Sequence, residues 1–218
     1  MTEKLFWQDP YQSSLDTRLT RIEADRVQLQ QTIFYAQSGG QESDAGSIAG
    51  RKVVLAQKCG QEIEYTLEDV SGLAVGDPVR VEIDAQRRYA LMRLHFAAEL
   101  VLELVCRLQP GIEKIGAHIA ADKARIDFIH AQNISPLFAA IETEVARIVA
   151  AGLPIRSEFS DRQGERRYWQ IEGVAQVPCG GTHLRNSAEV GALHLKRKNI
   201  GQGKERIEIT LSPALPPG

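Results

Sequence analysis

The sequence has few cysteines and no long apolar run, and each shortage excludes a class of protein. Its three cysteines, Cys59, Cys106 and Cys179, are too sparse among 218 residues for a disulfide scaffold and are typical of a reducing compartment. The sequence contains no run of about 18 apolar residues, so it predicts no membrane-spanning helix. Its first residues also lack an apolar stretch of signal-peptide length. We therefore expect a globular cytoplasmic protein with no membrane partner.

The sequence also lacks a large excess of positive or negative charge. The chain has 26 Lys and Arg residues against 28 Asp and Glu residues, which gives a net charge of −2. This balance excludes a bulk polycation, so any contact with nucleic acid must come from a local basic patch. The hydrophobic fraction of 43% and the charged fraction of 25% are close to globular averages and argue against global disorder.

The hydrophobic period changes near residue 85. Before it, short alternating segments such as Glu62–Leu67 and Pro78–Ile83 are separated by turns that contain glycine or proline. Short strands at this spacing predict a small β-barrel-like domain over residues 1–85. Residues 35–46, which are mostly small or polar, are predicted to form a loop inside this domain.

After residue 85 the apolar residues recur every three or four positions. This period predicts an amphipathic helix over residues 86–108. A second helix is predicted over residues 135–151, with Ser135 as its N-cap and Pro136 in its first turn. Helices among strands predict an α+β domain with a mainly antiparallel sheet over residues 86–218. Its strands are predicted at residues 155–159, 168–171, 191–195 and 205–211.

Two segments of residues 86–218 carry candidate metal ligands. His95 and Glu99 lie four residues apart on the first predicted helix, so they share one face of it. Cys179 and His183 are also four apart, and the two glycines between them are expected to permit a tight turn. Two nitrogens, one sulfur and one oxygen are a donor set of the zinc type. The alternatives are a solvated helix pair and a small cysteine of the core.

The residues around Cys179 form a longer and more specific string. Pro-Cys-Gly-Gly-Thr-His at residues 178–183 resembles the signature of alanyl-tRNA synthetase editing domains and their free-standing relatives, the AlaX proteins. Residues 32–46, 88–95 and 196–207 resemble, in the same order, the family's Gly-rich loop, the beginning of its metal-bearing helix and its closing basic hairpin. The length is similar to that of the medium AlaX type, in which a small β domain precedes the editing domain.

The resemblance implies a hydrolase that deacylates mischarged tRNA(Ala) in trans, with Ser-tRNA(Ala) as the substrate. It makes residues 86–218 a metal-binding tRNA-editing domain with a long helix that bears ligands. It implies tRNA, bound by its acceptor end, as the partner, and the family's usual description adds ATP binding. It assigns one zinc ion and the catalysis of metal-assisted ester hydrolysis to His95, Glu99, Cys179 and His183.

The sequence departs from the family at Glu99. The helix motif of the family is His-x-x-x-His, whereas this chain has a carboxylate at the second position. Glutamate is an accepted zinc ligand, but its charge weakens the ion as a Lewis acid and favours harder ions. The alternatives are another divalent metal, a ligand position given up to water, or a degenerate protein that binds metal or tRNA without activity. Editing of Ser-tRNA(Thr) is a further alternative, because the threonyl-tRNA synthetase editing domain shares the layout of the metal site.

Selection of serine requires a polar group that faces its hydroxyl, because an alanyl ester then leaves that group unpaired. The family-like stretch offers Thr32 for this role, with Gln41 as a second polar wall, and the alternative for Thr32 is an ordinary strand residue. Trp169 is interpreted as a packing aromatic, with stacking on a base as the alternative. The dense basic run is expected to bind phosphates of the acceptor end, with a solvated face as the alternative. Its residues are Lys196, Arg197, Lys198, Lys204 and Arg206, and Arg162, Arg166 and Arg167 are expected to extend the same surface.

Overall fold

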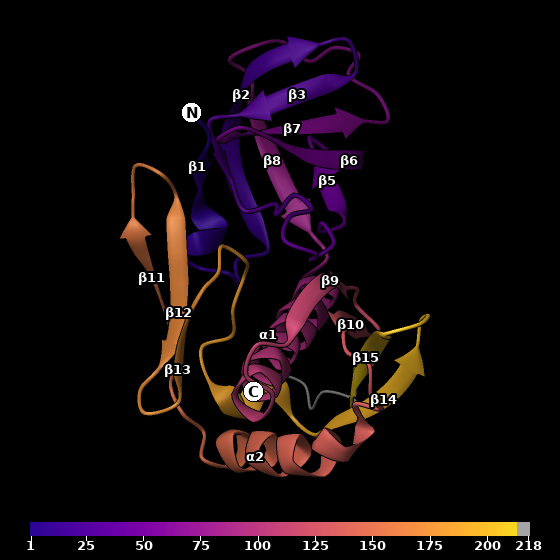
Figure 1. Cartoon of the computed structure of the whole chain (residues 1–218). Helices are drawn as coiled ribbons and strands as arrows, with labels where there is room; N and C mark the ends of the chain where they lie inside the picture. Colours follow the sequence, from indigo (N-terminus) through magenta and orange to yellow (C-terminus); the bar gives the residue numbers. More distant parts are fainter. Residues whose placement is uncertain (213–218) are drawn as a thin grey trace. The chain divides into compact units, whose positions relative to one another are not determined.

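The computed structural model describes residues 1–212 of the chain, which divides after Tyr89 into two compact units (Figure 1). The fold is α+β, with mainly antiparallel sheets and few helices, as the sequence predicts. Among the described residues, no helix has both the length and the apolar content needed to cross a membrane.

The first unit is built from short strands around one apolar core. Six strands close into a barrel in the order β2-β3-β7-β6-β5-β8, and β1 pairs with β4 in parallel. Alternation decides the inward face, since Val79, Val81 and Ile83 of β8 are buried while their neighbours are exposed. The elements are β1 (Glu3–Lys4), η1 (Leu5–Trp7), β2 (Ser14–Glu23), β3 (Arg26–Leu29), β4 (Gln31–Thr32), β5 (Gly46–Ile48), β6 (Arg51–Cys59), β7 (Glu62–Leu67) and β8 (Pro78–Ile83).

A buried ion pair fixes the loop of residues 35–46 within the first unit. Arg88 donates hydrogen bonds to both carboxylate oxygens of Asp44, and both side chains are almost completely buried. The same guanidinium donates to the carbonyl oxygens of Pro10 and Ile33, at 2.8 and 2.6 Å. Asp44 also accepts from the backbone N–H of Tyr35 at 2.7 Å. A pair with this many partners satisfies the donors and acceptors that burial would otherwise leave unpaired.

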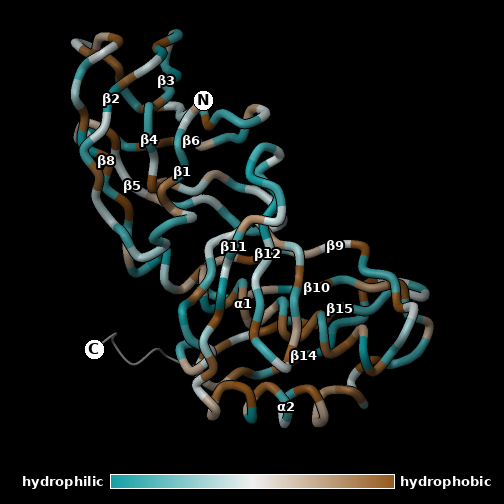
Figure 2. Tube along the Cα trace, turned by 90° about the vertical axis from the view of Figure 1, so that its left-hand side faces the viewer, coloured by the Kyte–Doolittle hydropathy of each residue, from teal (hydrophilic) through white to brown (hydrophobic). Residues whose placement is uncertain are grey.

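The second unit places a long helix between two antiparallel sheets (Figures 1 and 2). One sheet has four strands in the order β14-β15-β10-β9, and the other has three in the order β11-β12-β13. Apolar and polar residues alternate along the second helix, α2, in Figure 2. The elements are α1 (Ala85–Leu108), β9 (Glu113–Ile119), β10 (Ala124–Ile129), η2 (Ser135–Leu137), α2 (Phe138–Ala150), β11 (Arg156–Asp161), β12 (Arg166–Ile171), β13 (Ala175–Pro178), η3 (Ser187–Val190), β14 (Leu193–Asn199) and β15 (Lys204–Leu211).

Helix α1 differs from the amphipathic helix that the sequence predicts. Every residue from position 91 to 98 is buried, so this stretch of the helix has no exposed polar face. Its buried Arg93 donates to the carbonyl oxygens of Glu189, Val190 and Ser212, at 2.9, 2.7 and 3.1 Å. These bonds fix α1 against the end of η3 and the end of the last strand.

The start of the second helix is a further difference. Residues 135–137 form a 3₁₀ turn, and α2 begins only at Phe138. Ser135 is not an N-cap, since its hydroxyl donates to the Asn133 side chain at 2.7 Å. Strands β9, β10 and β13 were not among the strands predicted from the sequence.

Candidate metal centre

Four side chains of the second unit converge on one point. His95 and Glu99 come from α1, and Cys179 and His183 come from the loop after β13. Each offers one donor atom, and these atoms all lie within 4.8 Å of one another. The two residues of α1 meet because positions four apart share a helix face. The sequence-predicted ligands are therefore brought together, and the cluster could hold a metal ion.

The contacts within the cluster link a thiol, a carboxylate and two imidazoles. His95 Nε2 lies 3.3 Å from Cys179 Sγ and 3.3 Å from Glu99 Oε1. His183 Nε2 lies 3.7 Å from Glu99 Oε2. The two imidazole rings meet edge to face, with their centroids 5.3 Å apart.

The ring of His183 supports the fit of a metal ion most directly. Its Nδ1 lies 3.1 Å from Ser157 Oγ, whereas its Nε2 is buried and has no hydrogen-bond partner within residues 1–212. Burial lowers the pKa of His183 to about 3, although the Glu99 carboxylate favours the protonated ring. With its proton on Nδ1, toward the Ser157 hydroxyl, a neutral ring keeps a lone pair on Nε2, beside the Glu99 carboxylate. A buried lone pair among thiol, carboxylate and imidazole donors fits a cation of the zinc class.

Opposite charges balance in the rest of the cluster. Burial opposes the protonation of His95, but the charges of Cys179 and Glu99 outweigh it and raise the pKa of His95 to about 10. Burial also opposes the charge of Glu99, yet His95 outweighs it and lowers the pKa of Glu99 to about 2. The proton on His95 and the charge on Glu99 therefore balance each other, and a metal ion bound through His95 would take the place of that proton.

The two glycines before His183 have a different role from the one expected. Neither Gly180 nor Gly181 has a positive φ, so the turn does not require glycine for its backbone conformation. Apart from Gly180 itself and its two chain neighbours, no residue of the described chain has a heavy atom within 4 Å of the place where a Cβ on Gly180 would stand. The expectation that a Cβ would obstruct the turn is wrong at Gly180, which instead leaves open space beside Cys179.

One cross-strand pair of the three-stranded sheet supports two of the four candidate ligands. Ser157 of β11 and Trp169 of β12 are register partners. Ser157 contacts His183, and Trp169 Nε1 donates a hydrogen bond to Glu99 Oε2. The sequence predicted packing, or stacking on a base, for Trp169 rather than this contact. The alternation of β12 could have placed it on the inner face, but no local signal links it to a helix residue 70 positions away.

The predicted serine-selecting residues belong to the first unit. Thr32 and Gln41 are both fully buried. The Thr32 hydroxyl lies 2.7 Å from the Tyr65 hydroxyl and accepts from the backbone N–H of Phe34 at 3.0 Å. Their role in selecting serine stays a prediction.

The predicted basic surface separates into exposed and paired side chains. Lys196, Lys198 and Lys204 are exposed and form no ion pair with the described residues. Arg206 is paired instead, because its Nε donates to Asp127 Oδ1 at 2.6 Å. Arg197 is also paired, because its guanidinium donates two hydrogen bonds to the carboxylate of Glu205.

Arg167 is not a surface residue, contrary to the sequence expectation. Its side chain is 6% exposed, and its guanidinium packs over the Phe159 ring at 4.5 Å from the centroid. Arg167, Trp169 and Ile171 are the buried residues of β12, at every second position, so they share its inner face. Arg162 and Arg166 remain exposed, around the β11–β12 turn.

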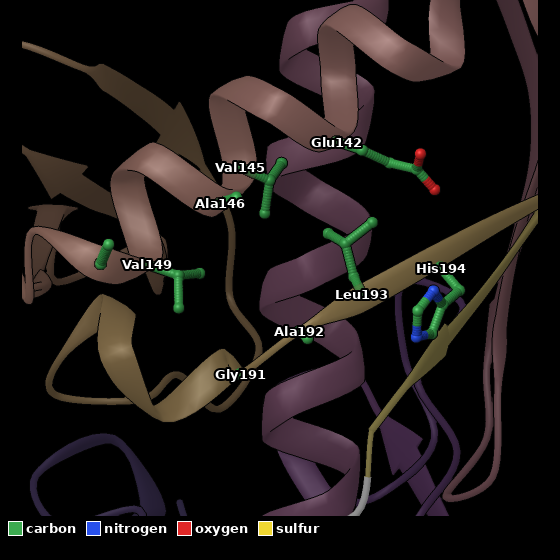
Figure 3. Close-up of a pocket in the computed structure, with 9 residues that line it drawn as sticks. Glu142, Val145, Ala146, Val149, Gly191, Ala192, Leu193 and His194 are labelled. Atoms are coloured by element: carbon green, nitrogen blue, oxygen red, sulfur yellow. The ribbon is translucent and has the colours of Figure 1, made fainter.

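A separate apolar pocket lies between α2 and the start of β14 (Figure 3). Its volume is about 450 Å³. Val145 and Val149 of α2 form one wall, and Leu193 of β14 forms another. Glu142, at its edge, accepts a hydrogen bond from the backbone N–H of Leu195 at 3.0 Å. The pocket is distinct from the candidate metal centre.

Comparison with known proteins gives matches to tRNA-editing proteins. Residues 169–208 match the family described as the threonyl and alanyl tRNA synthetase second additional domain. The chain is 32% identical over 215 residues to alanyl-tRNA editing protein AlaX-M of Pyrococcus horikoshii, covering 97% of this chain and 98% of that protein. A protein of the same name from Methanosarcina barkeri is 31% identical, with 97% and 99% covered. An alanine–tRNA ligase of Methanococcus aeolicus is 32% identical over 96% of this chain, which spans only 25% of the ligase.

We expect the cluster to bind one zinc ion per chain, and we expect this binding to depend on each of the four donor residues. We expect His183→Ala and Cys179→Ala to lose most of the zinc that the wild-type protein retains through purification, because each removes a donor. Mass spectrometry of the metal content per chain measures this. Cys106→Ala is the matched control, because it removes an exposed cysteine outside the cluster. Equal zinc content in all four proteins would show that the ion is not held here.

Proposed function

The chain belongs to the AlaX-M family of alanyl-tRNA editing proteins, and we propose that it removes serine from mischarged Ser-tRNA(Ala) by metal-assisted hydrolysis of the ester. It is an aminoacyl-tRNA deacylase that acts on tRNA in trans. We assign the chemistry to residues 86–218. The observation that carries the proposal is the convergence of His95, Glu99, Cys179 and His183 in a chain that matches editing proteins over nearly its whole length.

The reaction makes modest demands, and the residues of the cluster suit them. An aminoacyl ester on a ribose hydroxyl is already activated, so hydrolysis needs a positioned water and stabilisation of charge rather than a strong nucleophile. His95, Glu99, Cys179 and His183 would hold the ion. A bound divalent ion supplies a Lewis acid and lowers the pKa of water.

The surroundings of the cluster explain how this chain would orient its ligands and admit the ester. Ser157 holds the ring of His183 through Nδ1, which leaves Nε2 for the centre. The side chain of Glu99 keeps 17% of its surface exposed, and Gly180 leaves space beside Cys179. A partly open centre of this kind suits the end of a tRNA acceptor strand better than a closed structural site does.

The proposal is tested by the release of labelled serine from Ser-tRNA(Ala), with Ala-tRNA(Ala) and Ser-tRNA(Thr) measured alongside. We expect serine release from tRNA(Ala) to exceed alanine release by at least about a hundredfold, because a site that binds the hydroxyl disfavours a substrate without it. Preference for Ser-tRNA(Thr) would move the assignment to the threonine system. No release by zinc-loaded protein that still binds tRNA would identify a degenerate binding protein.

We propose that Thr32 contributes to the selection of serine. Thr32→Val keeps the shape of the side chain and removes its hydroxyl, so the ratio of serine to alanine release should fall at least about tenfold. The rates on both tRNAs measure this ratio. Thr17→Val is the control, because it also removes a buried hydroxyl of the first unit that accepts a hydrogen bond. An unchanged ratio in Thr32→Val, with thermal stability lowered as in the control, would leave Thr32 a purely structural residue.

We propose that the exposed lysines of β14 and β15 bind phosphates of the acceptor end. Lys196 and Lys198 alternate with inward residues along β14, so both project from the same face of the sheet. Charge reversal in Lys196→Glu/Lys198→Glu should weaken tRNA binding and flatten its salt dependence by about one unit of slope for each lost contact.

Binding of tRNA at several salt concentrations tests this patch. Lys58→Glu/Lys123→Glu is the matched control, because it changes the net charge equally at two exposed lysines elsewhere. A salt slope of the β14 variant equal to that of the control would exclude these lysines from the tRNA contact.

A further inference from the structure

A buried tryptophan contacts the candidate metal centre from the three-stranded sheet. Trp169 is 0% exposed, and its ring packs edge to face on Phe96 of α1 with the centroids 4.8 Å apart. Its Nε1 donates a hydrogen bond to Glu99 Oε2. The other carboxylate oxygen, Oε1, lies 3.3 Å from His95 Nε2 inside the cluster. The indole thus binds Oε2, which lies 3.7 Å from His183 Nε2, and leaves Oε1 beside His95 Nε2 for the centre.

The chemistry of this contact makes the two residues depend on each other. An indole N–H can only donate, and a fully buried one needs an acceptor. The carboxylate of Glu99 supplies that acceptor and has a second oxygen left for an ion. Removal of either group would leave the other without its buried partner.

A histidine at position 99 would not make the same contact. A neutral imidazole that binds an ion through one ring nitrogen carries its proton on the other nitrogen. That outer nitrogen would then be a donor, and it would face the indole N–H of Trp169, which is also a donor. Two buried donors cannot satisfy each other, so the surroundings of position 99 in this chain suit a carboxylate.

We propose that Trp169 is a positioning residue for the metal centre, and that Glu99 and Trp169 form a matched pair in which the indole orients the carboxylate so that Oε1 faces the ion. Glu99, held by Trp169, takes the place of the second histidine of the family's helix motif, and metal binding is kept. This inference rests on the metal centre of the proposed function. It makes Glu99 a working ligand.

A double-mutant cycle on the full-length protein tests the pair. The probe is Zn²⁺, and its affinity is measured by competition with a chromophoric chelator for wild type, Trp169→Phe, Glu99→His and the double variant. Phenylalanine keeps a ring against Phe96 and removes only the N–H donor. We expect Trp169→Phe to weaken Zn²⁺ binding about 10- to 100-fold in the wild-type background.

The Glu99→His background gives the result that a packing role would not produce. There, Trp169→Phe should leave Zn²⁺ affinity unchanged or raise it, because it removes an unsatisfied donor. Equal weakening in both backgrounds would reduce Trp169 to a packing residue, and no weakening in the wild-type background would overturn the proposal. Zn²⁺ that does not bind wild type would overturn it as well.

Two further measurements guard against other causes of a lost affinity. The melting temperature of each metal-free variant reports any loss of folding. Ser157→Ala, which releases His183 instead of Glu99, should weaken Zn²⁺ binding without coupling to Glu99→His.

Fluorescence follows the contact directly. In Trp7→Phe, Trp169 is the one remaining tryptophan, so its emission should change until one equivalent of Zn²⁺ is bound. A flat emission in this variant would contradict the contact. If the Zn²⁺ affinities follow the expected double-mutant cycle but the protein releases no serine, this inference stands and only the proposed deacylation of Ser-tRNA(Ala) is refuted.

Discussion

The gathering of four ionisable side chains in one largely buried place is the constraint on which the second unit depends. His95 and His183 are buried and Glu99 and Cys179 half-buried where α1 meets the loop of Cys179 and His183, and a buried charge is stable only when it is paired and hydrogen-bonded. His95 meets this condition by lying between Cys179 and Glu99. His183 meets it by staying neutral, with Ser157 at one ring nitrogen. Because Nε2 of His183 has no hydrogen-bond partner among the described residues, the cluster is not a closed network of hydrogen bonds and could hold a cation.

This constraint accounts for the burial of α1 over residues 91–98, the stretch that carries His95 and ends just before Glu99. A half-exposed helix would leave His95 and Glu99 in water, where an ion pair contributes little and long side chains take many rotamers. Arg93, two residues before His95, fixes the helix by donating to three backbone carbonyls of the second unit. One of them belongs to Val190, just before Gly191, whose φ of +72° suits glycine. A Cβ on Gly191 would lie 2.9 Å from the Arg93 guanidinium, so the close approach depends on glycine as well.

Local patterns in the sequence predicted the elements and the ligands, but not the partners across the fold. The change of period gave α1 to within one residue at its start, and the spacing of His95 and Glu99 gave their common face. Arg206 and Arg167 were misjudged as free surface cations, because their partners, Asp127 and the ring of Phe159, lie on neighbouring strands. Likewise, nothing near Trp169 in the sequence indicates that its acceptor is on α1. Strands β9 and β10 were missed because their mixture of charged and apolar residues lacks the clear alternation of β8.

The carboxylate at position 99 changes the charge of the centre more than its shape. When ionised, Cys179 and Glu99 together carry two negative charges, so with two neutral imidazoles they would neutralise a divalent ion completely. A third imidazole in place of Glu99 would leave one positive charge and a stronger Lewis acid. That stronger acid is needed for an unreactive bond, whereas an aminoacyl ester is already activated. In the proposed mechanism Glu99 would therefore serve the hydrolysis of this ester as long as Trp169 keeps the free oxygen of Glu99 directed at the centre. Retention of the metal would then depend on the sheet as much as on the helix.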